Sequence, residues 1–295
     1  MTVYRGKGRR LAVTLLGQVA RRAKRIAGAV VRPSYVAAGH FYSPLTSKSD
    51  IERALKTSPS LAGIDLREDA QFELLGTMAP LWRERPRGRY DTPGNSMFPS
   101  SDAAVLSALI RMVSPKQIIE VGSGYSSAVM LDSRDEATQL TFVEPYPERL
   151  QGLIRPDDKN WELIQSSVQE TELELFRRLN RDDILFIDST HVMKAGSDVG
   201  YLLFQVLPNL ASGVLVHFHD VFYAEYGLGY QDGWLAEHRD WNEAYFLQAF
   251  LMNSASYEIV LFNDYIWQMH SSVVKQYLPE TVRQRPGGIW LRKIS

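Results

Sequence analysis

Four side chains that could move protons or bind a metal follow two strand-like apolar runs. Asp188 and His191 come directly after one run, and His219 and Asp220 come after the next. Because neighbouring parallel strands bring their carboxyl ends to one edge of a sheet, we expect these four side chains to lie close together. Carboxylate and imidazole groups can accept a proton or bind a divalent cation. The spacing therefore predicts a catalytic or metal site at this edge.

The four residues receive separate predicted roles. We predict that His191 acts as a general base, and that Asp188 and Asp220 are catalytic residues that bind a metal or the acceptor. The predicted ligands of a divalent metal ion are Asp188, His219 and Asp220, because the chain has no cysteine to supply a thiolate. His217 lies within the second apolar run, so we expect it to be structural.

An earlier apolar run ends in a glycine turn that could hold a nucleoside cofactor. Gly122 and Gly124 follow residues 117–121 and precede a predicted helix. Such a turn allows close approach of the backbone to a ligand, and the helix N-terminus offers free N–H groups. Glu144 lies 22 residues after Gly122 at the end of the next predicted strand, where an acid can accept both hydroxyls of a ribose.

Two kinds of nucleoside cofactor fit this pattern. A dinucleotide fingerprint needs a third small residue, where this chain has Ser127, and its pyrophosphate is repelled by a carboxylate at Glu120. The same carboxylate suits the ammonium and sulfonium groups of S-adenosylmethionine. The residues therefore favour S-adenosylmethionine, and a nicotinamide-dependent oxidoreductase or epimerase is the alternative.

The rest of the chain supplies the elements that must position these residues. From residue 100 onward, short apolar runs alternate with helical ones, which predicts a doubly wound, mostly parallel α/β sheet with a late antiparallel hairpin. The predicted strands are Gln117–Val121, Leu140–Glu144, Glu162–Gln165, Asp183–Ile187, Gly213–His217, Tyr257–Phe262 and Gly288–Arg292. The predicted helices are Lys48–Thr57, Leu66–Trp82, Ser101–Val113, Tyr125–Leu131, Pro147–Ile154, Thr171–Leu179, Gly196–Leu207 and Asn242–Leu251.

Charge separates an N-terminal arm from the rest of the chain. The net charge is −1, but residues 1–49 hold ten basic residues and no acidic one, which leaves 23 basic against 34 acidic residues. The net charge of −1 for the whole chain argues against a nucleic-acid-binding protein. We predict three parts: a basic amphipathic arm (1–33), a helical cap or lid (34–95) and a cofactor-binding domain (96–295). Residues 9–32 could lie on an anionic membrane surface, and packing on the body is the alternative.

Several motifs together resemble class I S-adenosylmethionine-dependent methyltransferases. Within that group they are most similar to a bacterial branch that acts on small molecules. They are Glu120-Val121-Gly122-Ser123-Gly124, the strand that ends at Glu144, Phe186–His191, Gly213–Asp220, Gly39–Pro44 and Trp241–Phe250. The resemblance implies a seven-stranded Rossmann-like sheet. It also implies that the cofactor is held by Glu120, Gly122, Ser123, Gly124, Tyr125, Glu144, Ser166, Ser167 and Asp188, with Glu144 on the ribose and the two serines near the adenine.

These observations predict an S-adenosylmethionine-dependent methyltransferase. We expect it to methylate oxygen of a small-molecule or sugar-containing acceptor by in-line transfer, with help from a base or a divalent metal. A catalytically silent, membrane-associated binding protein is the alternative from another class. No secretory signal or membrane span is evident, so the expected location is cytoplasmic, with peripheral contact at the inner membrane surface through the arm.

Overall fold

The computed structural model describes residues 34–84, 89–91, 95, 97–278 and 284–295. The chain divides into two compact units at Ser47. The first unit ends there, and Lys48–Ser295 form the second. The amphipathic helix predicted within residues 1–33 lies outside the described residues. Among those described, no helix is both long and apolar enough to cross a bilayer.

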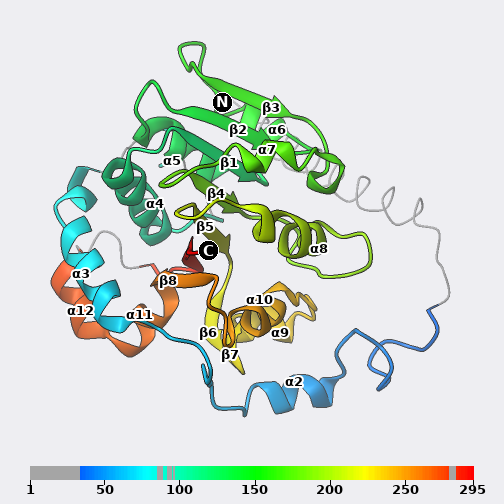
Figure 1. Cartoon of the computed structure of the whole chain (residues 1–295). Coiled ribbons are helices and arrows are strands. Elements are labelled where there is room, and N and C mark those ends of the chain that lie inside the picture. The colour runs from blue at the N-terminus through cyan, green and yellow to red at the C-terminus, as the bar shows by residue number, and fades with distance from the viewer. Residues whose placement is uncertain (1–33, 85–88, 92–94, 96, 279–283) are drawn as a thin grey trace, which may run out of the picture. The chain divides into compact units, whose positions relative to one another are not determined.

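A seven-stranded sheet forms the centre of the second unit (Figure 1). Its spatial order is β3-β2-β1-β4-β5-β9-β8. The first five strands pair in parallel, and β9 runs antiparallel to both β5 and β8. This arrangement confirms the predicted fold class. The strands are β1 (Gln117–Val121), β2 (Gln139–Val143), β3 (Trp161–Ile164), β4 (Ile184–Ile187), β5 (Leu215–His219), β8 (Tyr257–Phe262) and β9 (Gly288–Lys293).

The register of the parallel strands aligns their carboxyl ends. Val121 of β1 lies opposite Val143 of β2 and Ile187 of β4, and Ile187 in turn lies opposite Phe218 of β5. Every residue of β4 and β5 is buried, as continuously apolar strands require when helices cover both faces. The residues that follow the four strands are therefore held side by side at one edge.

Helices flank this sheet, and Figure 1 shows α4 and α8 at separate sides of it. The helix predicted at 196–207 changes pitch along its length: α8 continues as a π-helical turn, Leu202–Val206, and then a 3-10 turn, Leu207–Asn209. The elements that match predicted helices are α2 (Lys48–Ala54), α3 (Glu68–Met78), α4 (Ser100–Val113), α5 (Tyr125–Ser133), α6 (Glu148–Gln151), α7 (Glu174–Arg177), α8 (Asp198–Tyr201) and α10 (Glu243–Leu251).

Several short elements were not predicted from the sequence. The strands β6 (Phe222–Ala224) and β7 (Gly227–Gly229) form a separate antiparallel hairpin directly after β5. The helices α9 (Asp232–Ala236), α11 (Asn263–Met269) and α12 (Ser271–Tyr277) are too short for their apolar periodicity to be distinctive.

The arginine-rich loop before residue 95 is tied to the sheet domain. Part of it lies outside the described residues, but Arg89 is buried and bonds both carboxylate oxygens of Asp158 at 2.6 and 2.9 Å. Its Nε lies 2.7 Å from Asp132 at the end of α5. These contacts of Arg89 hold this part of the chain against the sheet domain. Residues from Lys48 onward form one compact unit together with the sheet.

Candidate functional site

The glycine turn after β1 requires glycine at its first position. Gly122 has φ +81°, and a Cβ atom there would lie 1.8 Å from the carbonyl oxygen of Asp188. The backbones at the ends of β1 and β4 therefore approach each other closely. The turn leads into α5, where the N–H of Gly124 donates to the Ser127 hydroxyl.

Glu120 does not face the ligand space, which corrects its predicted role. Its side chain is fully buried beneath the turn, and its two carboxylate oxygens accept hydrogen bonds from the hydroxyls of Ser126 and Ser127. Burial raises the pKa of Glu120 to about 8 despite these bonds. Glu120 thus supports the turn from below, and its carboxylate is no direct contact for a cationic ligand.

Two adjoining cavities open along the strand ends. The first, of about 370 Å³, is lined by the glycine turn with Tyr125, and by Asp188, His191, Asp220 and Trp241. The second, of about 360 Å³, extends toward β3 and includes Ser167. Gly122, Glu144 and Asp188 line both cavities. The two cavities therefore form one trough that passes over the ends of β1, β2 and β4.

Glu144 lies at the junction of the two cavities. Its carboxylate accepts backbone N–H groups from Ser123 at 3.0 Å and from Tyr146 at 2.7 Å. These bonds fix the orientation of the carboxylate and leave acceptor positions for a ligand hydroxyl. Ser167 lines the trough, whereas the Ser166 hydroxyl bonds to Glu170 at 3.2 Å and is not among the lining residues. Of the two serines predicted to lie near the adenine, Ser167 is the one that lines the trough.

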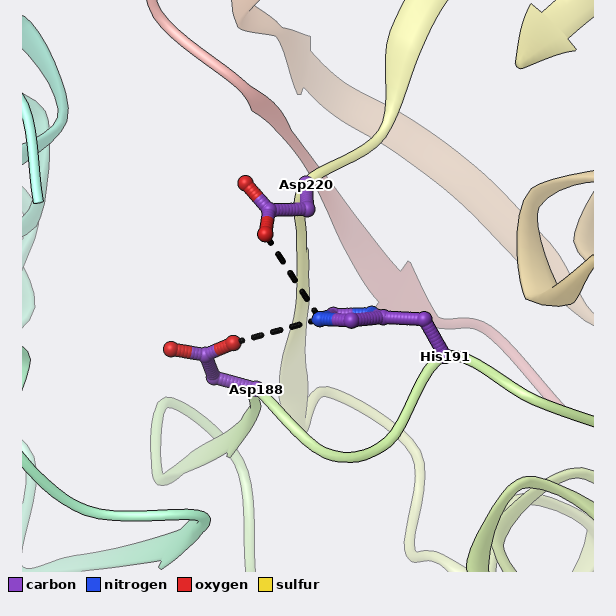
Figure 2. A group of neighbouring side chains, drawn as sticks. All are labelled: Asp188, His191 and Asp220. Carbon is purple, nitrogen blue, oxygen red and sulfur yellow. Dashed lines mark ion pairs between the residues drawn. The ribbon is translucent and has the colours of Figure 1, made fainter. Parts of the chain in front are cut away.

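Asp188, His191 and Asp220 converge at the other end of the trough (Figure 2). His191 Nε2 lies 3.5 Å from a carboxylate oxygen of Asp188 and 3.6 Å from one of Asp220. One potential ligand atom from each of the three residues lies within 4.8 Å of the others. The side chain of His191 is buried, while those of the two aspartates are partly open to the cavity. The structure thus brings together the predicted base, His191, and the two aspartates predicted to bind a metal or the acceptor.

The predicted metal ligand His219 is not part of this cluster. Among the described residues, the group that meets the geometry for a metal ion contains His191 in its place. His219 is still the last residue of β5, because the strand extends two residues further than predicted, and its ring is buried. Its Nε2 lies 3.6 Å from a carboxylate oxygen of Asp220, and His219 lines the first cavity. His217 is a buried strand residue as expected, with its ring stacked on Phe186.

Glu243 was missed as a site residue by the sequence reasoning. Its carboxylate lies 2.9 Å from His191 Nδ1, and its side chain is 1% exposed. It comes from the first turn of α10, 52 positions after His191. The sequence signal for it was the Trp241–Phe250 motif, which contributes to the family resemblance but assigns no role to Glu243.

Electrostatics of the cluster follow from burial among carboxylates. Burial alone would lower the pKa of His191, but hydrogen bonds to Asp188 and Glu243 raise it well above its usual value. Burial raises the pKa of Asp220. For Asp188 the effect of burial is outweighed by His219 and His191, which lower its pKa. The cluster thus favours a positive charge between Asp188 and Asp220.

Comparison with known proteins agrees with this geometry. Residues 119–221, from β1 to the residue after Asp220, match the family model described as a methyltransferase domain. The seven-stranded, mostly parallel sheet with its late antiparallel hairpin is the fold expected from the resemblance to class I enzymes. Residues 119–221 belong to a methyltransferase domain. The trough of this methyltransferase runs along the matched strand ends.

Individual relatives of the methyltransferase are distant. An uncharacterised protein from Archaeoglobus fulgidus is 29% identical over 166 residues, which are 50% of this chain and 74% of that protein. A putative O-methyltransferase from Klebsiella pneumoniae is similar with 16% identity and a TM-score of 0.46, covering 75% of this chain and 90% of that one. An O-methyltransferase of tomaymycin synthesis from Streptomyces achromogenes, solved with S-adenosylmethionine, has 14% identity and a TM-score of 0.45, with 76% and 90% covered.

Proposed function

We propose that the methyltransferase transfers a methyl group to an oxygen atom of a small-molecule or sugar-containing acceptor. The observation that carries this proposal is the position of Asp188, which lines both cavities of the trough and also contacts His191. A donor in the trough and an acceptor beside His191 would therefore meet at one side chain. Trp241, whose ring lies 4.6 Å from that of His191, offers an apolar wall for the acceptor.

The residues of the trough fit S-adenosylmethionine. Glu144 has acceptor positions left for the ribose hydroxyls, and Ser167 lies on the adenine side. Gly124 lines the first cavity, and a Cβ atom there would lie 3.0 Å from the side chain of Arg149, which lines it too. The proposed contacts are Gly122, Ser123, Gly124, Tyr125, Glu144, Ser167 and Asp188, with Glu120 acting through the two serines beneath the turn.

For this reaction the protein must align the acceptor with the methyl donor and remove one proton from the acceptor. When bound, S-adenosylmethionine supplies an electrophilic methyl carbon on a sulfonium. The protein must hold the acceptor oxygen in line with the carbon–sulfur bond and exclude water. The acceptor hydroxyl loses its proton to the His191, Asp188 and Asp220 cluster as the oxygen–carbon bond forms, and the sulfur leaves as a neutral thioether.

The same cluster fits a divalent metal ion. Two carboxylates and one imidazole are a donor set suited to Mn²⁺, Fe²⁺ or Zn²⁺, whereas Mg²⁺ prefers oxygen alone. Asp188, His191 and Asp220 would hold such an ion, which would lower the pKa of an acceptor hydroxyl. The carboxylate of Glu243 on His191 Nδ1 is the second contact that metal-binding histidines commonly have.

Substitution of Glu144 tests the cofactor part of the proposal, and labelled cofactor tests the reaction. Glu144→Gln should weaken binding of S-adenosylhomocysteine about tenfold or more, because charge-assisted hydrogen bonds to the ribose are lost. Glu148→Gln, an exposed residue in α6, is the matched control. With methyl-labelled S-adenosylmethionine and a small-molecule extract, the label should appear as an O-methyl carbon in NMR spectra. Label found only on nitrogen, carbon or protein would contradict the proposal.

We also propose that the N-terminal arm contacts an anionic membrane surface. The proposal is supported by the ten basic residues and the absence of acidic ones in residues 1–49. Next to the arm, Tyr35, Phe41 and Tyr42 are 92%, 81% and 68% exposed, and aromatic rings of this kind partition into the headgroup region. Cationic and aromatic residues together favour anionic lipid.

A further inference from the structure

We propose that Glu243 is a positioning residue, which fixes the ring of His191 so that Nε2 faces the acceptor. The proposal deepens the proposed function and rests on it. His191 Nδ1 and the Glu243 carboxylate are 2.9 Å apart, and both side chains are buried. Because a carboxylate accepts, Nδ1 carries a proton in this pair, and Nε2 points to the open side. There it lies between Asp188 and Asp220, on the side where the proposed function puts the methyl acceptor.

The backbone of His191 needs such support. His191 has φ +60°, in the left-handed region that residues other than glycine rarely occupy. Its carbonyl oxygen accepts two N–H groups from the start of α10, from Asn242 at 3.0 Å and Glu243 at 3.1 Å. One residue, Glu243, thus holds both the main chain and the ring of His191. A conformation of this kind persists where surrounding contacts determine it.

Neighbouring residues of the same segment hold the rest of the loop. The Asn242 side chain accepts the N–H of Met193 at 2.6 Å and donates to its carbonyl at 3.3 Å. Trp241 packs its ring against that of His191. Three consecutive residues, 241–243, therefore fasten the loop of His191 to the N-terminal end of α10. Within this set, Glu243 is the member that controls the protonated ring nitrogen.

A pair of substitutions separates the hydrogen bond from packing. Glu243→Gln keeps an oxygen that can accept the Nδ1 proton, whereas Glu243→Met fills a similar volume without a comparable acceptor. The control is Glu68→Gln, which alters the other described Glu–His pair: Glu68 lies 3.0 Å from His270 Nε2, away from the trough. The probe is ¹⁵N-labelled histidine in the full chain without cofactor, with the His191 signal assigned by His191→Gln.

We expect a protonated Nδ1 on His191 in the wild type, in Glu243→Gln and in the control. In Glu243→Met the ring should lose the proton on Nδ1 and keep the one on Nε2, and kcat should fall about 10- to 100-fold, the range typical of outer-shell partners. Binding of S-adenosylhomocysteine should change less than about twofold, because Glu243 does not line the trough. An unprotonated Nδ1 in the wild type, or an unchanged nitrogen in Glu243→Met, would overturn the proposal.

These readouts are independent of the proposed function. The nitrogen spectra require no cofactor and no acceptor, so they remain informative if Glu243→Met does not fold, because the wild type alone can refute the assignment of the proton. Failure of S-adenosylhomocysteine to bind the wild type would instead contradict the proposed function and leave the Glu243–His191 result standing.

Discussion

Glu120 should make the stability of the protein fall as the pH rises. Burial raises its pKa from 4.5 to about 8, so the folded chain keeps a proton that the unfolded chain releases. The stabilisation is fully present below about pH 4.5 and is lost as the pH rises through 8. A difference of roughly 3.5 pKa units corresponds to about 5 kcal/mol in total, of which about 2 kcal/mol is lost between pH 6 and pH 8.

The Glu120→Gln variant removes this titration while keeping the size of the side chain. Urea unfolding of the cofactor-free chain at pH 6 and pH 8 should show the wild type losing about 2 kcal/mol more than the variant. Glu225, whose pKa burial raises to about 7, is present in both proteins and cancels in the difference. The exposed Glu136→Gln is the control and should follow the wild type. Equal losses in wild type and Glu120→Gln would refute the reasoning.

Three further predictions concern the turn, the metal and the arm. Gly122→Ala should lower the free energy of unfolding by about 2 kcal/mol or more in urea titrations, since its Cβ would overlap the Asp188 carbonyl. The control Gly196→Ala, at φ +75° with nothing within 4 Å, should lower the free energy of unfolding by less. Equal decreases in the two variants would contradict the close approach of the backbones at Gly122 and Asp188. If the cluster holds a metal, excess chelator should abolish turnover, Mn²⁺ should restore it, and Asp220→Asn should weaken Mn²⁺ binding in calorimetry; full turnover in chelator would eliminate an essential ion. A chain that starts at Ser34 should lose co-sedimentation with anionic vesicles, and partitioning equal to that of the full chain would contradict membrane contact through the arm.

The sheet and its edge could be predicted because their signals are local. Continuously apolar runs mark parallel strands, and a glycine turn between strand and helix marks the ligand edge. Asp188 and Asp220 follow from the same rule, since each comes directly after a strand. The strand ends of the structure then align them through the register of Ile187 with Phe218.

The errors have particular physical causes. Side chains alternate across a strand, so a residue close to the turn in sequence need not face the ligand, as Glu120 shows. His219 was taken to follow β5, whereas the strand continues through it. Its ring lies beside Asp220, and the group with metal-binding geometry contains His191 instead. His191 and Glu243 are 52 positions apart and meet only through the tertiary packing of α10. No spacing rule connects residues at such a separation, so this pair could be found only in the structure.

Calorimetry with the full-length protein tests the central claim most directly. S-adenosylhomocysteine and S-adenosylmethionine should each bind with one site per chain and compete with each other, and NADH should produce no heat. Binding of NADH together with no binding of either sulfur compound at millimolar concentration would contradict the account.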